Sequence, residues 1–131
     1  MADWRDVRRL ALALPETSER TSRERAQWRV KDKLFVWERP LRAKEVEELG
    51  PLAPEGAIMG ARVEHLIAKE ALLADDPGIF FTTSHFHNVA AVLVRLDEID
   101  GATLEEIVTE AWLARAPERL GRDYLQRSEE P

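Results

Sequence analysis

The stretch Ala26–Pro40, AQWRVKDKLFVWERP, alternates apolar and polar residues on both sides of a short charged turn. This pattern is typical of a β-hairpin. Whether the two-residue turn is Lys31-Asp32 or Asp32-Lys33, the antiparallel register predicts that four apolar residues share one face, because a shift of one residue would exchange the faces. We expect them to pack in a core, with an exposed platform for stacking bases as the alternative. These residues are Trp28, Val30, Phe35 and Trp37.

Elements on either side of this hairpin predict an α+β domain. Asp3 is a suitable N-cap for a first helix with apolar residues at helical spacing, and Pro15 ends it. The expected order continues with a polar link over 16–25, the hairpin, a short helix over 42–50, a strand over 57–64, a helix over 64–77, strands near 79–83 and 90–96, and a helix from Thr103 that is interrupted at Pro117.

This order of elements predicts a single compact domain over 1–127, in which an antiparallel sheet of β-hairpins is flanked by helices, and a frayed C-terminal tail over 128–131. In the helix over 64–77, Leu66, Ile67 and Ala71 are expected to face the core together with Leu72 or Leu73.

Composition is typical of a globular protein without an export signal. The chain has 131 residues, a net charge of −6 and no cysteine. Its N-terminal residues mix acids with bases and are typical of a helix, not of a signal peptide. The longest apolar runs have about the length of a strand, so we expect no membrane contact. The lack of cysteine excludes disulfides and thiolate chemistry and fits a reducing compartment, so we expect a cytoplasmic protein.

Basic residues are concentrated in one part of the chain. Between Arg20 and Lys44, nine basic residues stand against three acidic ones, a local charge of +6, so the other residues carry −12. A basic segment of this kind can steer a polyanion to one face of a protein. Solvated mixed charge is the more common explanation, and the negative total argues against general attraction to nucleic acid.

A second stretch, Phe80–Leu96, holds two of the three histidines, His85 and His87. Histidines at positions i and i+2 of a strand share a face, and this spacing occurs in metal sites. A third ligand would have to be His65 or Glu64, and no pattern in the sequence places either nearby. We therefore expect no bound metal.

No other group of residues predicts catalysis. Ser84 lies beside His85, but neighbours in a strand point to opposite faces, and no G-x-S-x-G elbow surrounds the serine. Isolated glycines match no phosphate-binding loop, and adjacent acids such as Asp75-Asp76 are typical of solvated helix surface. We expect no catalytic residues and no cofactor, and therefore a protein that is not an enzyme.

Five phrases in this order resemble the MmcQ/YjbR family. They are LALALPETSERTS, WRVKDKLFVWERP, KEALLADDPGIFFTTSHF, AAVLVRLDEID and LEEIVTEAWLARAPERL. The resemblance runs from Val7 to Tyr124. It implies a compact α+β fold similar to that of the frataxin-like CyaY proteins, with β-hairpins described as a double wing. It also implies a DNA-binding role and supplies no catalytic residues.

The chain departs from the family pattern at two places. The family often has glycines in the first hairpin turn, where this chain has Lys31 and Asp32. The family phrase of the TTPH type has Ser84 here in place of its proline. His85 belongs to that phrase, whereas His87 is particular to this chain, which weakens the case for a paired metal site.

These observations predict a noncatalytic DNA-binding or regulatory protein. Its basic side chains on the first hairpin would contact the phosphates of duplex DNA, which supplies affinity without sequence information. The alternative is a module that binds a protein or a small ligand and no nucleic acid. The predicted contacts are Arg29, Lys31, Lys33 and Arg39, with Arg23, Arg25 and Arg42 as further candidates.

Overall fold

The predicted hairpin forms in the computed structural model of the protein, which describes residues 2–129. Strands β2 (Arg25–Val30) and β3 (Lys33–Glu38) pair antiparallel around the turn residues Lys31 and Asp32. Both turn residues have left-handed backbones, with φ of 48° and 68°. Two positive φ angles match the twist of the flanking strands, and glycine or asparagine is favoured in such turns for that reason.

A β-bulge changes the faces of this hairpin. The register between β2 and β3 shifts after Trp28, so Phe35 is an additional residue in β3. Phe35 and Val36 are both buried in the main core with Trp28, whereas Trp37 packs half-buried in a second cluster. The predicted shared face is therefore correct for Trp28, Val30 and Phe35 and wrong for Trp37, because strict alternation fails at a bulge.

The polar link expected over 16–25 contains a strand. Strand β1 (Thr17–Ser22) pairs antiparallel with β2, and the turn residues Arg23 and Glu24 again have positive φ. Its sequence, TSERTS, has no apolar residue, and five of its six residues are exposed. Backbone hydrogen bonds with β2 hold this strand, which is why no hydrophobic pattern marks it.

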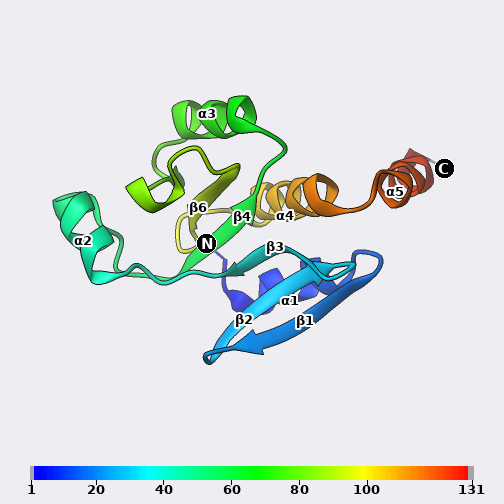
Figure 1. Cartoon of the computed structure of the whole chain (residues 1–131), viewed down its shortest axis with the longest axis horizontal. Helices are drawn as coiled ribbons and strands as arrows, with labels where there is room; N and C mark the ends of the chain where they lie inside the picture. Colours follow the sequence, from blue (N-terminus) through cyan, green and yellow to red (C-terminus); the bar gives the residue numbers. More distant parts are fainter. Residues whose placement is uncertain (1, 130–131) are drawn as a thin grey trace.

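Six antiparallel strands form one sheet in the order β1-β2-β3-β4-β6-β5 (Figure 1). Strand β4 (Ile58–Arg62) lies between β3 and β6 (Ala91–Arg95), and β5 (Phe80–Phe81) forms a short edge. The strand expected near 79–83 is this short because the chain enters a 3-10 turn, η2 (Ser84–Phe86).

Five α-helices lie in the described part of the chain. Asp3 caps the first helix as predicted, whereas the helix expected from Thr103 begins earlier and is capped by Asp100. The last helix includes residues 128 and 129, which were expected to fray, and 130–131 lie outside the described residues. The helices are α1 (Trp4–Leu12), α2 (Ala43–Leu49), α3 (Leu66–Asp75), α4 (Gly101–Arg115) and α5 (Glu118–Glu129), with a 3-10 turn, η1 (Gly50–Leu52), after α2.

Helices α1 and α4 cover one side of the sheet, called here the inner face (Figure 1). Trp4 of α1 stacks on Trp28 of β2, with 6.2 Å between the ring centroids. Trp112 of α4 is fully buried, and its indole N–H donates to the carbonyl oxygen of Pro15 at 3.0 Å. These contacts join both helices and the hairpin into one core.

The opposite side of the sheet, the outer face, is covered over β4, β6 and β5. There a second cluster around Phe81, Phe86 and Leu93 lies under η2 and α2, with Trp37 at its border. Over β1 and β2, none of the helices within residues 2–129 packs on the outer face (Figure 1). Half of the outer face is therefore open to solvent.

Gly60 of β4 lies against the Trp37 indole, and a Cβ at position 60 would overlap the ring. We expect Gly60→Ala to lower the free energy of unfolding by about 1–3 kcal/mol, because overpacking displaces the indole from the second cluster. In a Trp37→Ala background the same substitution should cost much less. Denaturant titrations of wild type, Gly60→Ala, Trp37→Ala and the double variant measure how much the cost of Gly60→Ala changes when the indole is absent. Gly101→Ala is the control, since no heavy atom lies within 4 Å of its added Cβ; equal costs of Gly60→Ala in both backgrounds would contradict the assignment.

Candidate functional site

Arg39, one of the four predicted phosphate contacts, is buried, with 8% of its surface exposed. Its guanidinium donates two hydrogen bonds to the Glu45 carboxylate, at 2.8 and 3.0 Å, and another to the carbonyl oxygen of Pro40. The guanidinium carbon also lies 5.1 Å from the centroid of the Phe86 ring. The expectation for Arg39 is therefore corrected: α2 folds back over the end of β3 and occupies its donors.

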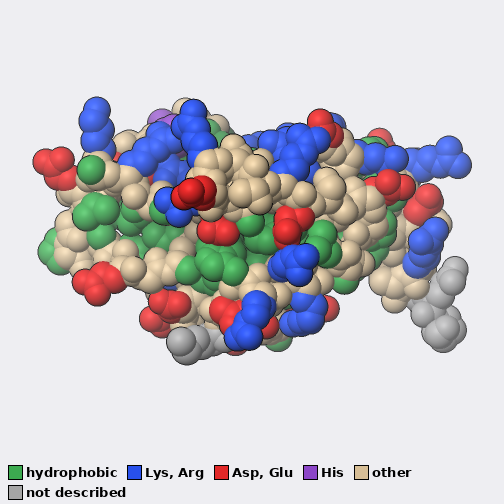
Figure 2. All heavy atoms as spheres, turned by 90° about the horizontal axis from the view of Figure 1, so that it is seen from below, with side chains coloured by type: hydrophobic (Ala, Val, Ile, Leu, Met, Phe, Trp, Pro, Cys, Tyr) green, Lys and Arg blue, Asp and Glu red, His purple; other side chains and the backbone are tan. Residues whose placement is uncertain are grey.

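Three arginines share the outer side of the β1–β2 pair. In the register of these strands, Arg20, Arg25 and Arg29 all lie on the side opposite the buried Trp28. We call this surface the basic face. Arg20 and Arg25 are exposed, and the half-buried Arg29 donates to the Gln27 side chain. Figure 2 shows Lys and Arg side chains along much of the upper edge of the molecule in that view. This edge is the side of the molecule that faces the viewer in Figure 1.

The tip of the hairpin beside the basic face carries Lys31 and Lys33, both exposed. The Lys31 ammonium lies 3.7 Å from a Glu16 carboxylate oxygen, and Arg20 forms an ion pair with Asp32. Lys33 has no ion pair within residues 2–129. Exposed ion pairs contribute about 0–1 kcal/mol, so they weaken the local positive charge without preventing a phosphate from competing.

A buried carboxylate, that of Glu45, joins three segments of the chain. Besides the Arg39 guanidinium, it accepts hydrogen bonds from the Arg42 backbone N–H at 2.9 Å and from the Thr83 hydroxyl at 2.7 Å. Burial opposes ionisation of this carboxyl, but the donors from Arg42, Thr83 and Arg39 outweigh it and lower the pKa of Glu45 to about 2. Glu45 is therefore ionised at neutral pH and fastens α2 to the sheet.

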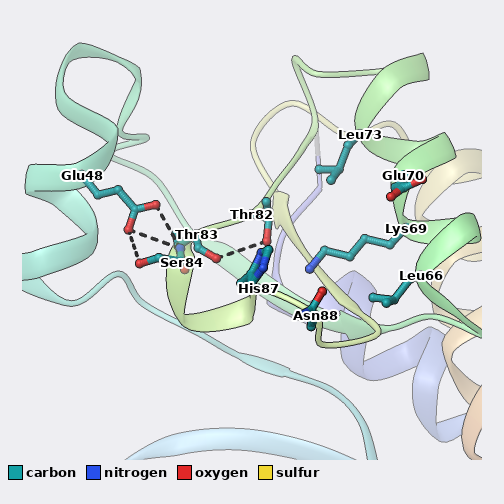
Figure 3. Close-up of a pocket in the computed structure, with 10 residues that line it drawn as sticks. All are labelled: Glu48, Leu66, Lys69, Glu70, Leu73, Thr82, Thr83, Ser84, His87 and Asn88. Carbon is teal, nitrogen blue, oxygen red and sulfur yellow. Dashed lines mark hydrogen bonds between the residues drawn. The ribbon is translucent and has the colours of Figure 1, made fainter.

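A second carboxylate on α2 binds the next residue of the same segment. Glu48, one helical turn after Glu45, accepts hydrogen bonds from the Ser84 backbone N–H at 3.0 Å and from its hydroxyl at 2.6 Å (Figure 3). The Ser84 hydroxyl is thus directed at a carboxylate and not at its neighbour His85. Two contacts one turn apart hold α2 against the Thr83–Ser84 segment.

An open cavity of about 400 Å³ lies beside this contact, between the Glu48 side chain, α3 and the segment 82–88 (Figure 3). Two leucines of α3 form its apolar wall, and Thr82, Ser84, His87 and Asn88 supply polar groups. Among its charged lining residues, Lys69 is buried, whereas Glu48 and Glu70 are exposed. The lining of the cavity therefore combines a lysine ammonium that is shielded from solvent with two carboxylates that are exposed to it.

Lys69 is only 5% exposed. Its ammonium donates to the carbonyl oxygens of Phe86, at 2.7 Å, and Val89, at 3.0 Å. Between these residues Asn88 has a left-handed φ of 60°, which asparagine tolerates better than most residues. Burial lowers the pKa of Lys69, and no carboxylate within residues 2–129 forms an ion pair with it.

Sequence reasoning missed Lys69 because the helix that carries it is turned differently from the expected orientation. Leu66, Ile67 and Ala71 were expected to face the core, but all three are exposed, Leu66 and Ile67 with 41% and 75% of their surfaces. Leu72 and Leu73 pack against the core as expected. Apolar residues occur all round this helix, so periodicity does not determine which side is buried.

The three histidines lie in different environments. His85 belongs to η2 and His87 follows it, so they do not share the face of a strand. The His85 ring is 3.4 Å from the Arg42 guanidinium, and His87 lines the cavity. His65 caps α3 by accepting the Ala68 N–H. Within the described residues, no three metal-ligating side chains come together.

The fold and the five sequence stretches quoted above can be compared with known proteins. A crystal structure of Deinococcus radiodurans protein DR2400, described as a DUF419 domain, is similar, with a TM-score of 0.64, 18% identity, and 86% of this chain and 78% of that chain covered. The family model described as YjbR matches residues 12–114. The chain belongs to the YjbR family, as its phrases indicated.

Related mycobacterial proteins have no assigned activity in their names. The uncharacterized proteins Rv2570 of Mycobacterium tuberculosis and Mb2600 of Mycobacterium bovis are each 48% identical to this chain over 131 residues, covering 98% of it and 99% of their own length. The chain therefore resembles them over almost its whole length. Among residues 2–129, no helix has the length and apolar character needed to cross a membrane.

The low pKa of Glu45 predicts acid sensitivity. Since folding lowers this pKa from 4.5 to about 2, the associated stability is fully present above 4.5 and is lost as the pH falls towards 2. We expect protonation of Glu45 to lower the free energy of unfolding by up to about 3 kcal/mol. Unfolding titrations between neutral and acidic pH should show a weaker pH dependence for Glu45→Gln. Glu47→Gln, on the exposed side of α2, is the control; parallel profiles of wild type and Glu45→Gln would refute the assignment.

Proposed function

We propose that this YjbR-family chain is a noncatalytic DNA-binding or regulatory protein that contacts phosphates through the basic face and the hairpin tip. The observation that carries the proposal is the open outer side of β1 and β2, on which Arg20, Arg25 and Arg29 lie together. Lys31 and Lys33 extend this positive surface at the tip. Arg39 has no part in it, because it is buried with its donors on Glu45. The donors of Arg29 bind the Gln27 side chain and the Asp32 carbonyl oxygen, but this arginine is only half-buried.

The spacing of the arginines on β2 suits duplex DNA. Strands β1 and β2 belong to a sheet that continues into β3, so their outer side would lie across a groove, which in the case of the major groove is about 12 Å wide. Arg25 and Arg29 are four residues apart on β2, a span of about 13 Å at the usual rise of a strand. The two arginines can therefore reach phosphate groups on either side of a groove. Contacts of this kind orient a protein on DNA without reading its sequence.

The acidic neighbours predict weak binding. Asp32 and Glu16 offset part of the charge of Arg20 and Lys31, and the whole chain carries −6. We expect dissociation constants in the micromolar range or weaker at physiological salt, as for other nonspecific contacts. Binding should weaken steeply as salt rises, because each phosphate contact releases condensed counterions.

A charge-reversed hairpin tests the proposal. In titrations of duplex DNA at low salt, Arg29→Glu combined with Lys31→Glu should abolish or strongly weaken binding. If residual binding is measurable, the logarithmic salt slope should fall by about two units, one for each lost contact. The matched control is Arg5→Glu with Arg9→Glu, which changes the net charge equally on exposed positions of α1, across the sheet from the basic face.

Equal weakening by both double variants would mean that overall charge and not the hairpin governs binding. Undetectable binding of wild type, or unchanged binding by a folded hairpin variant, would refute the DNA interface. The alternative of a protein-interaction module would then be preferred.

A further inference from the structure

The cavity beside α3 contains a cation without a matching anion. The Lys69 ammonium has three N–H donors, and two of them bind the carbonyl oxygens of Phe86 and Val89. Within residues 2–129, the third finds no acceptor and no carboxylate pairs with the charge. Buried charges are normally paired, since an ion loses its hydration on burial. An anionic group entering the cavity would supply the missing partner.

The other lining residues limit which anions fit. In Figure 3 the Lys69 ammonium points towards His87 and Asn88, while Glu48 lies on the far side of Ser84. The Glu48 carboxylate is bound by Ser84 but, with two oxygens, can accept further hydrogen bonds. A ligand with several negative charges would be repelled at this end. A ligand with a hydrogen-bond donor there would be attracted.

We propose that the cavity binds a small monocarboxylate that also carries an amino or hydroxyl group, with the carboxylate on the Lys69 ammonium and the donor group towards Glu48. The volume of about 400 Å³ is in the range of small-molecule sites. The cavity is open to solvent, and Glu48, Glu70 and His87 of its lining are exposed, so we expect affinities in the millimolar range for the smallest ligands. This proposal does not depend on DNA binding.

A purely structural Lys69 is the competing explanation. Its two hydrogen bonds clip the turn that contains Asn88, and this role alone could retain a lysine at the position. The two explanations differ in one observable result, because a structural clip gives no saturable response to carboxylates. The test must therefore measure ligand binding by the intact protein.

Three probes with four carbons each separate the contributions of the two ends. Butyrate has only the carboxylate, 4-aminobutyrate has both groups, and butylamine has only the cation. Titrations followed by amide chemical shifts should show saturable changes at Ser84, His87 and Asn88 with the two acids and none with butylamine. We expect 4-aminobutyrate to bind up to about fivefold more tightly than butyrate, the gain from one partly exposed ion pair.

Two substitutions assign the response to residues. Lys69→Met keeps an unbranched side chain, one atom shorter and without the charge, and should eliminate carboxylate binding. Glu48→Gln should tighten butyrate binding and remove the preference for 4-aminobutyrate, whereas Glu47→Gln, next to it on the exposed part of α2, should change neither. If Lys69→Met does not fold, the effect of Glu48→Gln on the two acids still shows whether they bind in the cavity as proposed. The proposal fails if neither acid gives saturable shifts, if folded Lys69→Met binds as wild type does, or if Glu48→Gln leaves the preference unchanged.

Discussion

The β-bulge at Phe35 determines what lies on each face of the sheet. With this additional residue, Phe35 and Val36 both enter the core under α1 and α4, and Trp37 turns to the other side, against Gly60. Strict alternation in β3 would instead place Trp37 with Phe35 and leave the second cluster without its large aromatic border. Helix α2, η2 and the cavity beside them rest on that cluster. One inserted residue therefore supports a sheet that is packed on two sides.

Periodicity located those elements whose burial follows a regular pattern. The hairpin, the helix capped by Asp3 and the helix carrying Leu104 and Ile107 were predicted from residue spacing. Strand β1 was missed because its stability comes from backbone pairing with β2 and not from a buried face. Trp37 was placed on the wrong side because a bulge leaves no mark in the pattern of apolar residues.

Charge counting found the basic segment but could not tell which of its members remain exposed. The fate of Arg39 depends on Glu45, six residues later, and on how α2 folds back towards Thr83. Lys69 likewise finds its acceptors on a turn 17 and 20 residues away in the chain. A long charged side chain can snorkel to water or bind a buried partner, and only the tertiary fold decides between these outcomes.

The two edges of the sheet differ in how they resist joining another molecule. A strand edge exposes unpaired backbone groups that can template cross-β association between copies. Here one edge, β1, is polar along its whole length and carries the adjacent charges of Glu19 and Arg20. The other edge, β5, offers only two residues, Phe80 and Phe81, before the backbone leaves the strand conformation. Neither edge is an apolar template of useful length, so the open half of the outer face can remain accessible without promoting fibre-like growth.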